Sequence, residues 1–124
     1  MRIRQATSKD NLLLSSLSMD VQRLHAENYP EIFKIPENDD FAIQFFDEKL
    51  IDPLVRIFIA EENSHALGYV LCKLVERAEN PFTFAMRHLL VDQISVRPDA
   101  QGKGVGKALL EQAEVLASFA SSSM

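Results

Sequence analysis

Apolar and polar positions alternate or cluster in four segments of the chain, as they do in β-strands. Met1 to Ala6 alternates, with Ile3 on the side opposite to its arginine neighbours, and predicts a short strand. Val55 to Ala60 and His65 to Val75 are apolar runs joined by a polar turn, and this pattern predicts an antiparallel hairpin. His88 to Val96 predicts a fourth strand.

Three other segments repeat apolar residues every three or four positions, which is the period of an α-helix. The first begins near Asn11, after capping residues at 7–10, and ends at Tyr29 because a proline follows. The second ends before Pro53, and the third begins at Val105. We expect their apolar faces to be core: Leu13, Leu17, Val21 and Leu24 in the first, Phe41, Phe45, Phe46 and Leu50 in the second, and Val105, Leu109, Ala113 and Leu116 in the third.

The resulting order, β-α-α-β-β-β-α, predicts an α/β fold of the α+β kind, a mixed sheet with helices on its faces. The length of 124 residues suits one domain, which we place at residues 1–118. Residues 119–124 show no periodicity and are predicted to be a frayed tail.

Composition narrows the range of partners. A net charge of −5 argues against nucleic acid as the main partner, because phosphate binding needs a basic surface. The single cysteine, Cys72, cannot form an internal disulfide and is expected in the core; three separated histidines predict no metal site. No apolar run approaches the ~20 residues that span a bilayer, and the N-terminus has no signal-like segment. We therefore expect a cytoplasmic protein with no membrane partner.

Three glycines stand between the fourth strand and the last helix: Gly102, Gly104 and Gly106. Main-chain N–H groups at such a helix start attract anions, and glycine lets an anion approach the backbone closely. Lys103 and Lys107 add positive charge. This segment therefore predicts a pyrophosphate site, against the alternative of a glycine-rich turn that only joins the strand to the helix.

Three phosphate-binding patterns can be compared with this loop. The nucleoside-triphosphate P-loop fails at Gln101, which takes the place of its first glycine, and at Ala108, which replaces its hydroxyl. The dinucleotide pattern requires glycine at Lys107. The third pattern, [Q/R]-x-x-G-x-[G/A], is matched fully by Gln101, Gly104 and Gly106.

With that pattern in that position, the chain resembles the GCN5-related N-acetyltransferase (GNAT) superfamily over roughly residues 1–118. The resemblance implies an acetyl-coenzyme A donor held by main-chain amides of the loop and a pantetheine arm paired along the fourth strand. The implied coenzyme-binding residues are Ile94, Ser95, Val96, Gln101, Gly102, Lys103, Gly104, Val105, Gly106 and Lys107.

The implied reaction is direct attack of a primary amine, from a small molecule or a peptide, on the thioester. Asp92 is our candidate for accepting the amine proton, because on a regular strand it shares a face with Ile94; the alternative is a solvated or ion-paired strand residue. An acceptor pocket for a cationic amine is expected around Glu27, Tyr29, Glu31 and Phe33, against the alternative of an ordinary helix end with packed aromatics.

The family continues with a further β-α-β-β part that this sequence does not supply. Neither Tyr29 nor Tyr69 matches the family's thiolate-protonating tyrosine, so we assign no general acid. The fourth strand then has an open apolar edge, which predicts a homodimer. The alternatives to an active N-acetyltransferase are a non-catalytic acyl-coenzyme A binding or scaffold module and a nucleotide-binding protein.

Overall fold

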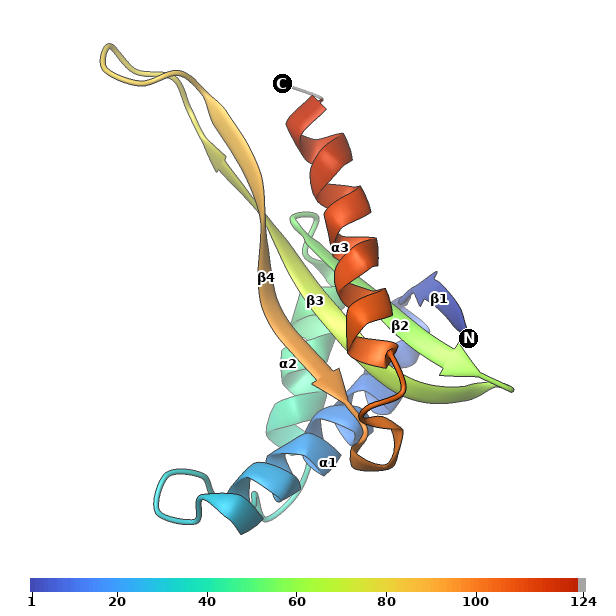
Figure 1. Cartoon of the computed structure of the whole chain (residues 1–124). Helices are drawn as coiled ribbons and strands as arrows, with labels where there is room; N and C mark the ends of the chain where they lie inside the picture. The colour runs from blue at the N-terminus through green and yellow to red at the C-terminus, as the bar shows by residue number, and fades with distance from the viewer. Residues whose placement is uncertain (123–124) are drawn as a thin grey trace.

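The protein is a four-stranded sheet with helices on both faces (Figure 1). This computed structural model describes residues 1–122. It confirms the predicted element order and fold class. The elements are β1 (Arg2–Gln5), α1 (Asn11–Asn28), α2 (Asp40–Ile51), β2 (Val55–Glu62), β3 (His65–Arg77), β4 (Met86–Val96) and α3 (Val105–Ser122), with short 3₁₀ turns at Ser8–Asp10 and Pro98–Ala100.

The strand order is β1-β2-β3-β4, and every neighbouring pair is antiparallel. Over the part of the chain that the structure describes, the sheet is therefore antiparallel, where the sequence analysis predicts a mixed one. Short connections account for two of the three pairs: β2 and β3 are joined only by Asn63 and Ser64, both with positive φ as in a tight hairpin turn, and β3 and β4 by residues 78–85. A parallel pair needs a crossover of a dozen or more residues.

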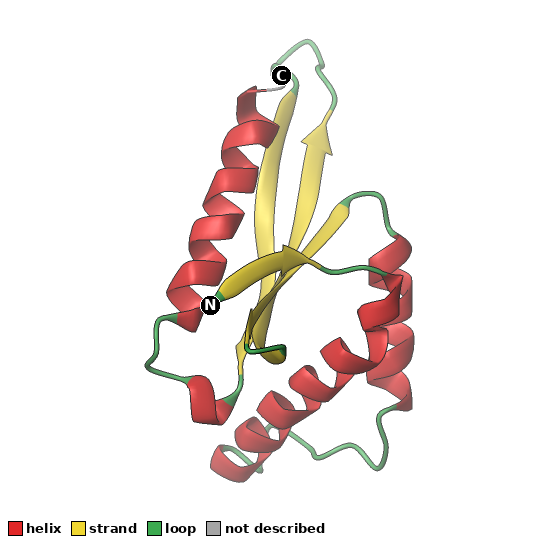
Figure 2. Cartoon of the chain, turned by 90° about the vertical axis from the view of Figure 1, so that its right-hand side faces the viewer, coloured by secondary structure: helices red, strands yellow, loops and turns green. Residues whose placement is uncertain are grey.

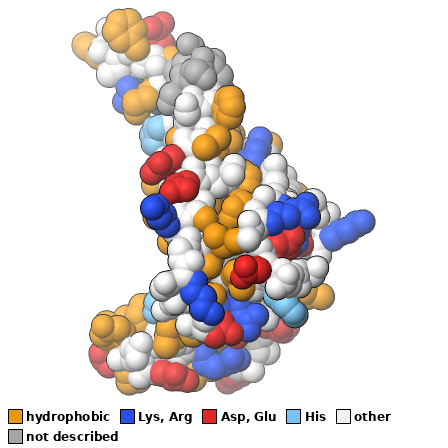
Figure 3. Space-filling view, turned by 45° about the vertical axis from the view of Figure 1, so that its right-hand side comes forward, with side chains coloured by type: hydrophobic (Ala, Val, Ile, Leu, Met, Phe, Trp, Pro, Cys, Tyr) orange, Lys and Arg blue, Asp and Glu red, His pale blue; other side chains and the backbone are white. Residues whose placement is uncertain are grey.

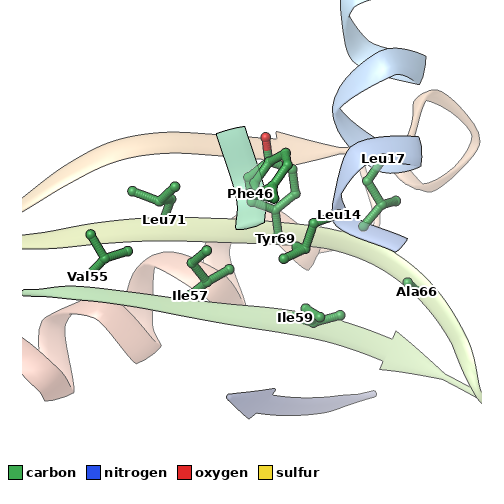
Figure 4. Packing of buried hydrophobic residues seen from close by; sticks show 9 residues of the cluster. All are labelled: Leu14, Leu17, Phe46, Val55, Ile57, Ile59, Ala66, Tyr69 and Leu71. Carbon is green, nitrogen blue, oxygen red and sulfur yellow. The ribbon is translucent and has the colours of Figure 1, made fainter. Parts of the chain in front are cut away.

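Helices cover both faces of the sheet (Figure 2), and each face has its own hydrophobic core. Alternate residues of β3 belong to different cores. Tyr69 and Leu71 pack towards α1 and α2 (Figure 4), whereas Val70 and Cys72 pack towards α3. The first core comprises Leu14, Leu17, Phe46, Val55, Ile57, Ile59, Ala66, Tyr69 and Leu71, and the second Phe58, Ala60, Val70, Cys72, Ala100, Val105, Leu109 and Ala113. Cys72 is fully buried, as predicted.

Phe41 is an exception to the predicted core. Its side chain is 81% exposed, while Phe46 on the same helix is 1% exposed. Five positions separate them, which turns Phe41 well away from the buried face at 3.6 residues per turn. Phe41 lies instead one turn before Phe45, on the flank of α2.

Helix α3 is longer than the sequence predicts. It runs to Ser122, so residues 119–122, predicted as tail, are helical; residues 123–124 lie outside the described part. The alanine-rich composition favours helix even where the apolar period has ended. None of the helices within residues 1–122 is long and apolar enough to cross a membrane.

Side-chain hydrogen bonds connect β1 with the turn before α1 and with β2. Thr7 and Asp10 form a capping box, in which the Thr7 N–H donates to Asp10 Oδ2 at 2.8 Å. The Arg4 guanidinium bonds both Asp10 oxygens, at 2.9 and 3.0 Å, and holds the pKa of that carboxyl below its usual value. Arg4 also bonds Glu61 of β2 at 3.1 Å.

Candidate functional site

Strand β4 contains one extra residue at Asp92. Gln93 is opposite Leu71 and Val91 is opposite Cys72, so Asp92 has no partner of its own on β3 and forms a β-bulge. The regular alternation that we used to relate Asp92 to Ile94 therefore does not hold here. Asp92 is exposed, and it lines a cavity that opens on the α1–α2 face of the sheet.

That cavity has a volume of about 610 Å³ and lies between α1, α2 and β4. Such a volume is typical of a small-molecule site. Its residues are Ser18, Met19, Val21, Gln22, His25, Pro36, Asn38, Phe41, Ala42, Phe45, Phe46, Tyr69, Asp92, Gln93, Ile94 and Ser95. The fold thus brings the candidate base Asp92 together with aromatic side chains of α2.

Tyr69 places a protonated phenol in the cavity wall. Its hydroxyl donates to Gln93 Oε1 at 2.9 Å, and its ring meets Phe46 edge-on at 5.5 Å between centroids (Figure 4). Burial raises the pKa of Tyr69, and a hydrogen bond with Ser95 offsets part of that rise. The sequence does not distinguish Tyr69 as a site residue, because it lies in an apolar run that resembles any buried strand.

The residues predicted to form the acceptor pocket do not line this cavity. Glu27 and Glu31 are exposed outside it, and the Tyr29 side chain is 54% exposed. Phe33 comes nearest, because its ring stacks on His25, which does line the cavity, at 5.1 Å. Helix α1 ends at Asn28 and the chain turns away there, so the pocket uses residues one and two turns earlier.

The glycine loop follows the C-terminal end of β4, a few residues after the segment that lines the cavity. Gly102 and Gly104 have φ of 80° and 82°, and a Cβ atom at either would meet nothing within 4 Å. The carbonyl of Gly104 accepts from the Ala108 N–H at 3.1 Å, which begins α3. The N–H groups of residues 104–107 therefore have no acceptor within the helix, and the loop is open to an approaching anion.

One hydrogen bond and one close approach of the backbone place this loop beside β4. The Gln101 amide donates to the Val96 carbonyl at 3.3 Å, and a Cβ on Gly106 would lie 3.8 Å from Val96 Cγ2. The exposed side chains of Lys103 and Lys107 add positive charge. The predicted coenzyme residues Val105 and Gly106 form the first turn of α3, where Val105 is buried in the core.

A fourth glycine, Gly68, allows the end of β4 to lie close to β3. A Cβ there would be 2.5 Å from the Ser95 carbonyl oxygen and 3.1 Å from Val96 Cα. Residues 94–96, the predicted pantetheine-pairing segment, therefore owe their position to this glycine. Cavity and loop thus adjoin one strand end, and no cluster of metal-ligating side chains occurs within the described chain.

Comparison with known proteins gives a consistent result. The model of the "Acetyltransferase (GNAT) family" matches residues 18–119. Among curated proteins, none matches the chain.

Solved structures share the fold at low sequence identity. An acetyltransferase from Vibrio fischeri is 19% identical with a TM-score of 0.75, covering 97% of this chain and 89% of its own. A ribosomal-protein-alanine N-acetyltransferase from Brucella melitensis is 24% identical with a TM-score of 0.68, and the match covers 98% of this chain and 75% of that protein. A predicted acetyltransferase from Clostridium acetobutylicum, solved with acetyl-CoA, is 22% identical, TM-score 0.69, with coverages of 94% and 73%.

Proposed function

Because the chain belongs to the acetyltransferase (GNAT) family, we propose that it transfers the acetyl group of acetyl-CoA to a primary amine. The observation that carries this proposal is the open glycine loop at the start of α3, directly after a strand whose other residues line a cavity. One structure of similar fold was solved with acetyl-CoA, which supports the choice of donor.

The loop suits the pyrophosphate of the coenzyme. Two positive-φ glycines and the N–H groups at the mouth of α3 form a main-chain cradle with no side chain in the way. Lys103 and Lys107 supply charge, and Gln101 holds the loop to the end of β4. In this proposal the segment Ile94 to Val96 pairs through its main chain with the pantetheine arm.

When bound, acetyl-CoA supplies an acetyl group activated as a thioester. In the proposed reaction a new C–N bond forms to the amine, the C–S bond breaks, and the electron pair leaves with the thiolate of coenzyme A. Asp92, on the cavity wall, accepts the proton that the amine loses, directly or through water. N–H groups at the end of β4 stabilise the negative charge on the carbonyl oxygen.

The second candidate function is a non-catalytic acyl-CoA binding or scaffold module. It is favoured by one feature of residues 1–122: they offer a coenzyme loop but no side chain that we can assign to protonate the leaving thiolate. The two functions make different predictions for binding and turnover.

Calorimetric titration with acetyl-CoA, run beside a thiol-release assay with a panel of amines, tests both. We expect binding together with amine-dependent release of the thiol; binding without release would favour the scaffold module. Gly104→Ala forces a side chain into positive φ, at a cost of about 1–2 kcal/mol, and should weaken binding about tenfold. Gly106→Ala, which the loop pattern itself allows, should change the affinity much less. Unchanged binding in Gly104→Ala would contradict the site.

A further inference from the structure

The cavity beside β4 has an unusual balance of charge. Of the residues that line it, only Asp92 is a carboxylate, and no lysine or arginine is among them. His25 is the only other lining residue, apart from the phenol of Tyr69, that can titrate. The remaining polar groups are hydroxyls and amides, which can orient a ligand but cannot balance a charge.

The opposite wall is aromatic, and one ring in it lacks cover. Phe46 is buried in the core and Phe45 is half-buried, with Lys49 Nζ 5.4 Å from its ring centroid. Phe41, one turn earlier on α2, lines the cavity with 81% of its side chain exposed. Exposing a phenylalanine ring to water is unfavourable, and a ligand with an apolar body would relieve that exposure.

We propose that the acceptor is a small amine with a single positive charge on an apolar, aromatic or aliphatic body. Its amino group binds as an ammonium ion to Asp92, and its body packs on Phe41 at the mouth of the cavity. Asp92 takes one proton so that the neutral nitrogen can attack, and the second proton leaves with the thiol of coenzyme A. This inference rests on the proposed function, because it names the kind of amine that the same site accepts.

The charge balance argues against polycationic acceptors. A polyamine needs several carboxylates, and among the residues that line this cavity a second ammonium group would find no second carboxylate. A small polar amine would leave Phe41 exposed and gain only the Asp92 contact.

A panel of amines tests the proposal by binding as well as by turnover. The panel comprises 2-phenylethylamine and hexylamine, the polar monoamine ethanolamine, and the polyamine spermidine. Binding is measured by calorimetry and by chemical-shift changes of the intact chain saturated with coenzyme A, and turnover by thiol release. We expect 2-phenylethylamine and hexylamine to bind most tightly, with shifts at Phe41 and Asp92.

Phe41→Ala tests the contact directly and, because the side chain is exposed, should fold normally. It should weaken the binding of 2-phenylethylamine about tenfold, which corresponds to about 1.4 kcal/mol, and raise the KM for this amine by the same factor. The binding of ethanolamine should not change. Phe41→Leu should recover hexylamine binding. The matched control is Phe82→Ala, which removes a 94% exposed phenylalanine at the tip of the β3–β4 hairpin, where hydrophobic side chains gather in Figure 3; it should change nothing.

The failures of the two proposals can be told apart. Three results would overturn the acceptor assignment alone. They are tightest binding of spermidine, no binding of any monoamine by a chain that holds coenzyme A, and equal effects of Phe41→Ala and Phe82→Ala. If coenzyme A does not bind while 2-phenylethylamine does, and Phe41→Ala abolishes that binding, the acceptor class stands and the acetyl-transfer proposal falls.

Discussion

Asp92 reaches the cavity through a local irregularity of its strand. The bulge gives β4 one residue more than β3 between the pairs Leu71–Gln93 and Cys72–Val91. Its carboxylate is exposed beside the cavity. If this group takes the amine proton, replacing it with an amide should remove the proton acceptor and keep the shape.

We therefore expect Asp92→Asn to lower kcat/KM about 100-fold, as removal of a general base does. It should also flatten the acidic limb of the pH–rate profile, while acetyl-CoA affinity stays the same. The measurement is steady-state kinetics across pH with the best amine of the panel. Glu79→Gln, an exposed carboxylate in the hairpin loop, is the control. A pH–rate profile of Asp92→Asn that overlies that of the unchanged protein would remove Asp92 as the base.

Cys72 carries a second prediction at this scale. Burial raises the pKa of the Cys72 thiol from 9.0 to about 11. A group whose pKa is raised on folding contributes its full stabilisation at pH values below its pKa in the unfolded chain. That contribution is lost as the pH rises through its pKa in the folded protein. The free energy of unfolding should thus fall between pH 9 and about 11.

Urea unfolding at several pH values measures this decline, and in Cys72→Ala the decline should be shallower, although the variant is less stable throughout. A thiol reagent at mildly alkaline pH should label the native protein slowly and the unfolded protein rapidly. Rapid labelling of the native protein would show that the thiol is accessible.

Residues of the site differ in how far the sequence could predict them. Gly102 and Gly104 were predictable, because a positive φ next to a helix start is a local requirement. Phe41 and Tyr69 were not, since their spacing is that of core residues and only the packing of α2 against β3 decides which ring stays outside. Asp92 was named on the premise of a regular strand, which the bulge makes wrong.

The ends of helices are predicted best where the chain has proline or capping residues. Proline ends α1 and α2 close to the expected places, and the Thr7–Asp10 capping box begins the 3₁₀ turn that leads into α1. The end of α3 was missed because alanine and serine sustain a helix without an apolar period. The antiparallel pairing of β2 with β3 follows from their short turn, whereas the directions of β1 and β4 do not follow from the sequence, because periodicity does not record which segments pair.

Gly68 shows how one residue fixes the relation between two strands. A methyl group there would lie 2.5 Å from the Ser95 carbonyl oxygen, a main-chain atom that cannot rotate away. Gly68→Ala should therefore push β4 from β3 and cost about 1–3 kcal/mol of stability.

The same change should weaken acetyl-CoA binding, because residues 94–96 and the Gln101 contact move with the strand. Urea unfolding and calorimetry measure the two effects. Gly106→Ala, where a Cβ would meet Val96 Cγ2 at an ordinary 3.8 Å, is the matched comparison and should affect stability less. Equal stability of Gly68→Ala and the unchanged protein would show that the strands can separate without loss.

At the scale of the whole molecule, β4 is an outer strand of the described sheet. It is 11 residues long and forms, with β3, a hairpin that projects beyond the helices (Figure 1). Leu90, Val91 and Ile94 along it are 38–47% exposed. An apolar, unpaired edge of this length favours pairing with another strand. We propose that a second copy of the chain covers the part of this edge before Ile94, as the sequence predicts, and that residues 94–96 are left to the pantetheine arm.

Sedimentation velocity over a wide concentration range tests this self-association. We expect the 14.0 kDa chain to sediment as a dimer at high concentration and as a monomer on dilution. Val91→Lys should shift the equilibrium strongly towards monomer, because a charge on the edge has to be desolvated when a second strand pairs. Leu12→Lys, at a 62% exposed position on α1, is the control and should leave association unchanged. A chain that stays monomeric at every concentration, or a dimer that Val91→Lys does not weaken, would mean that β4 does not form this interface.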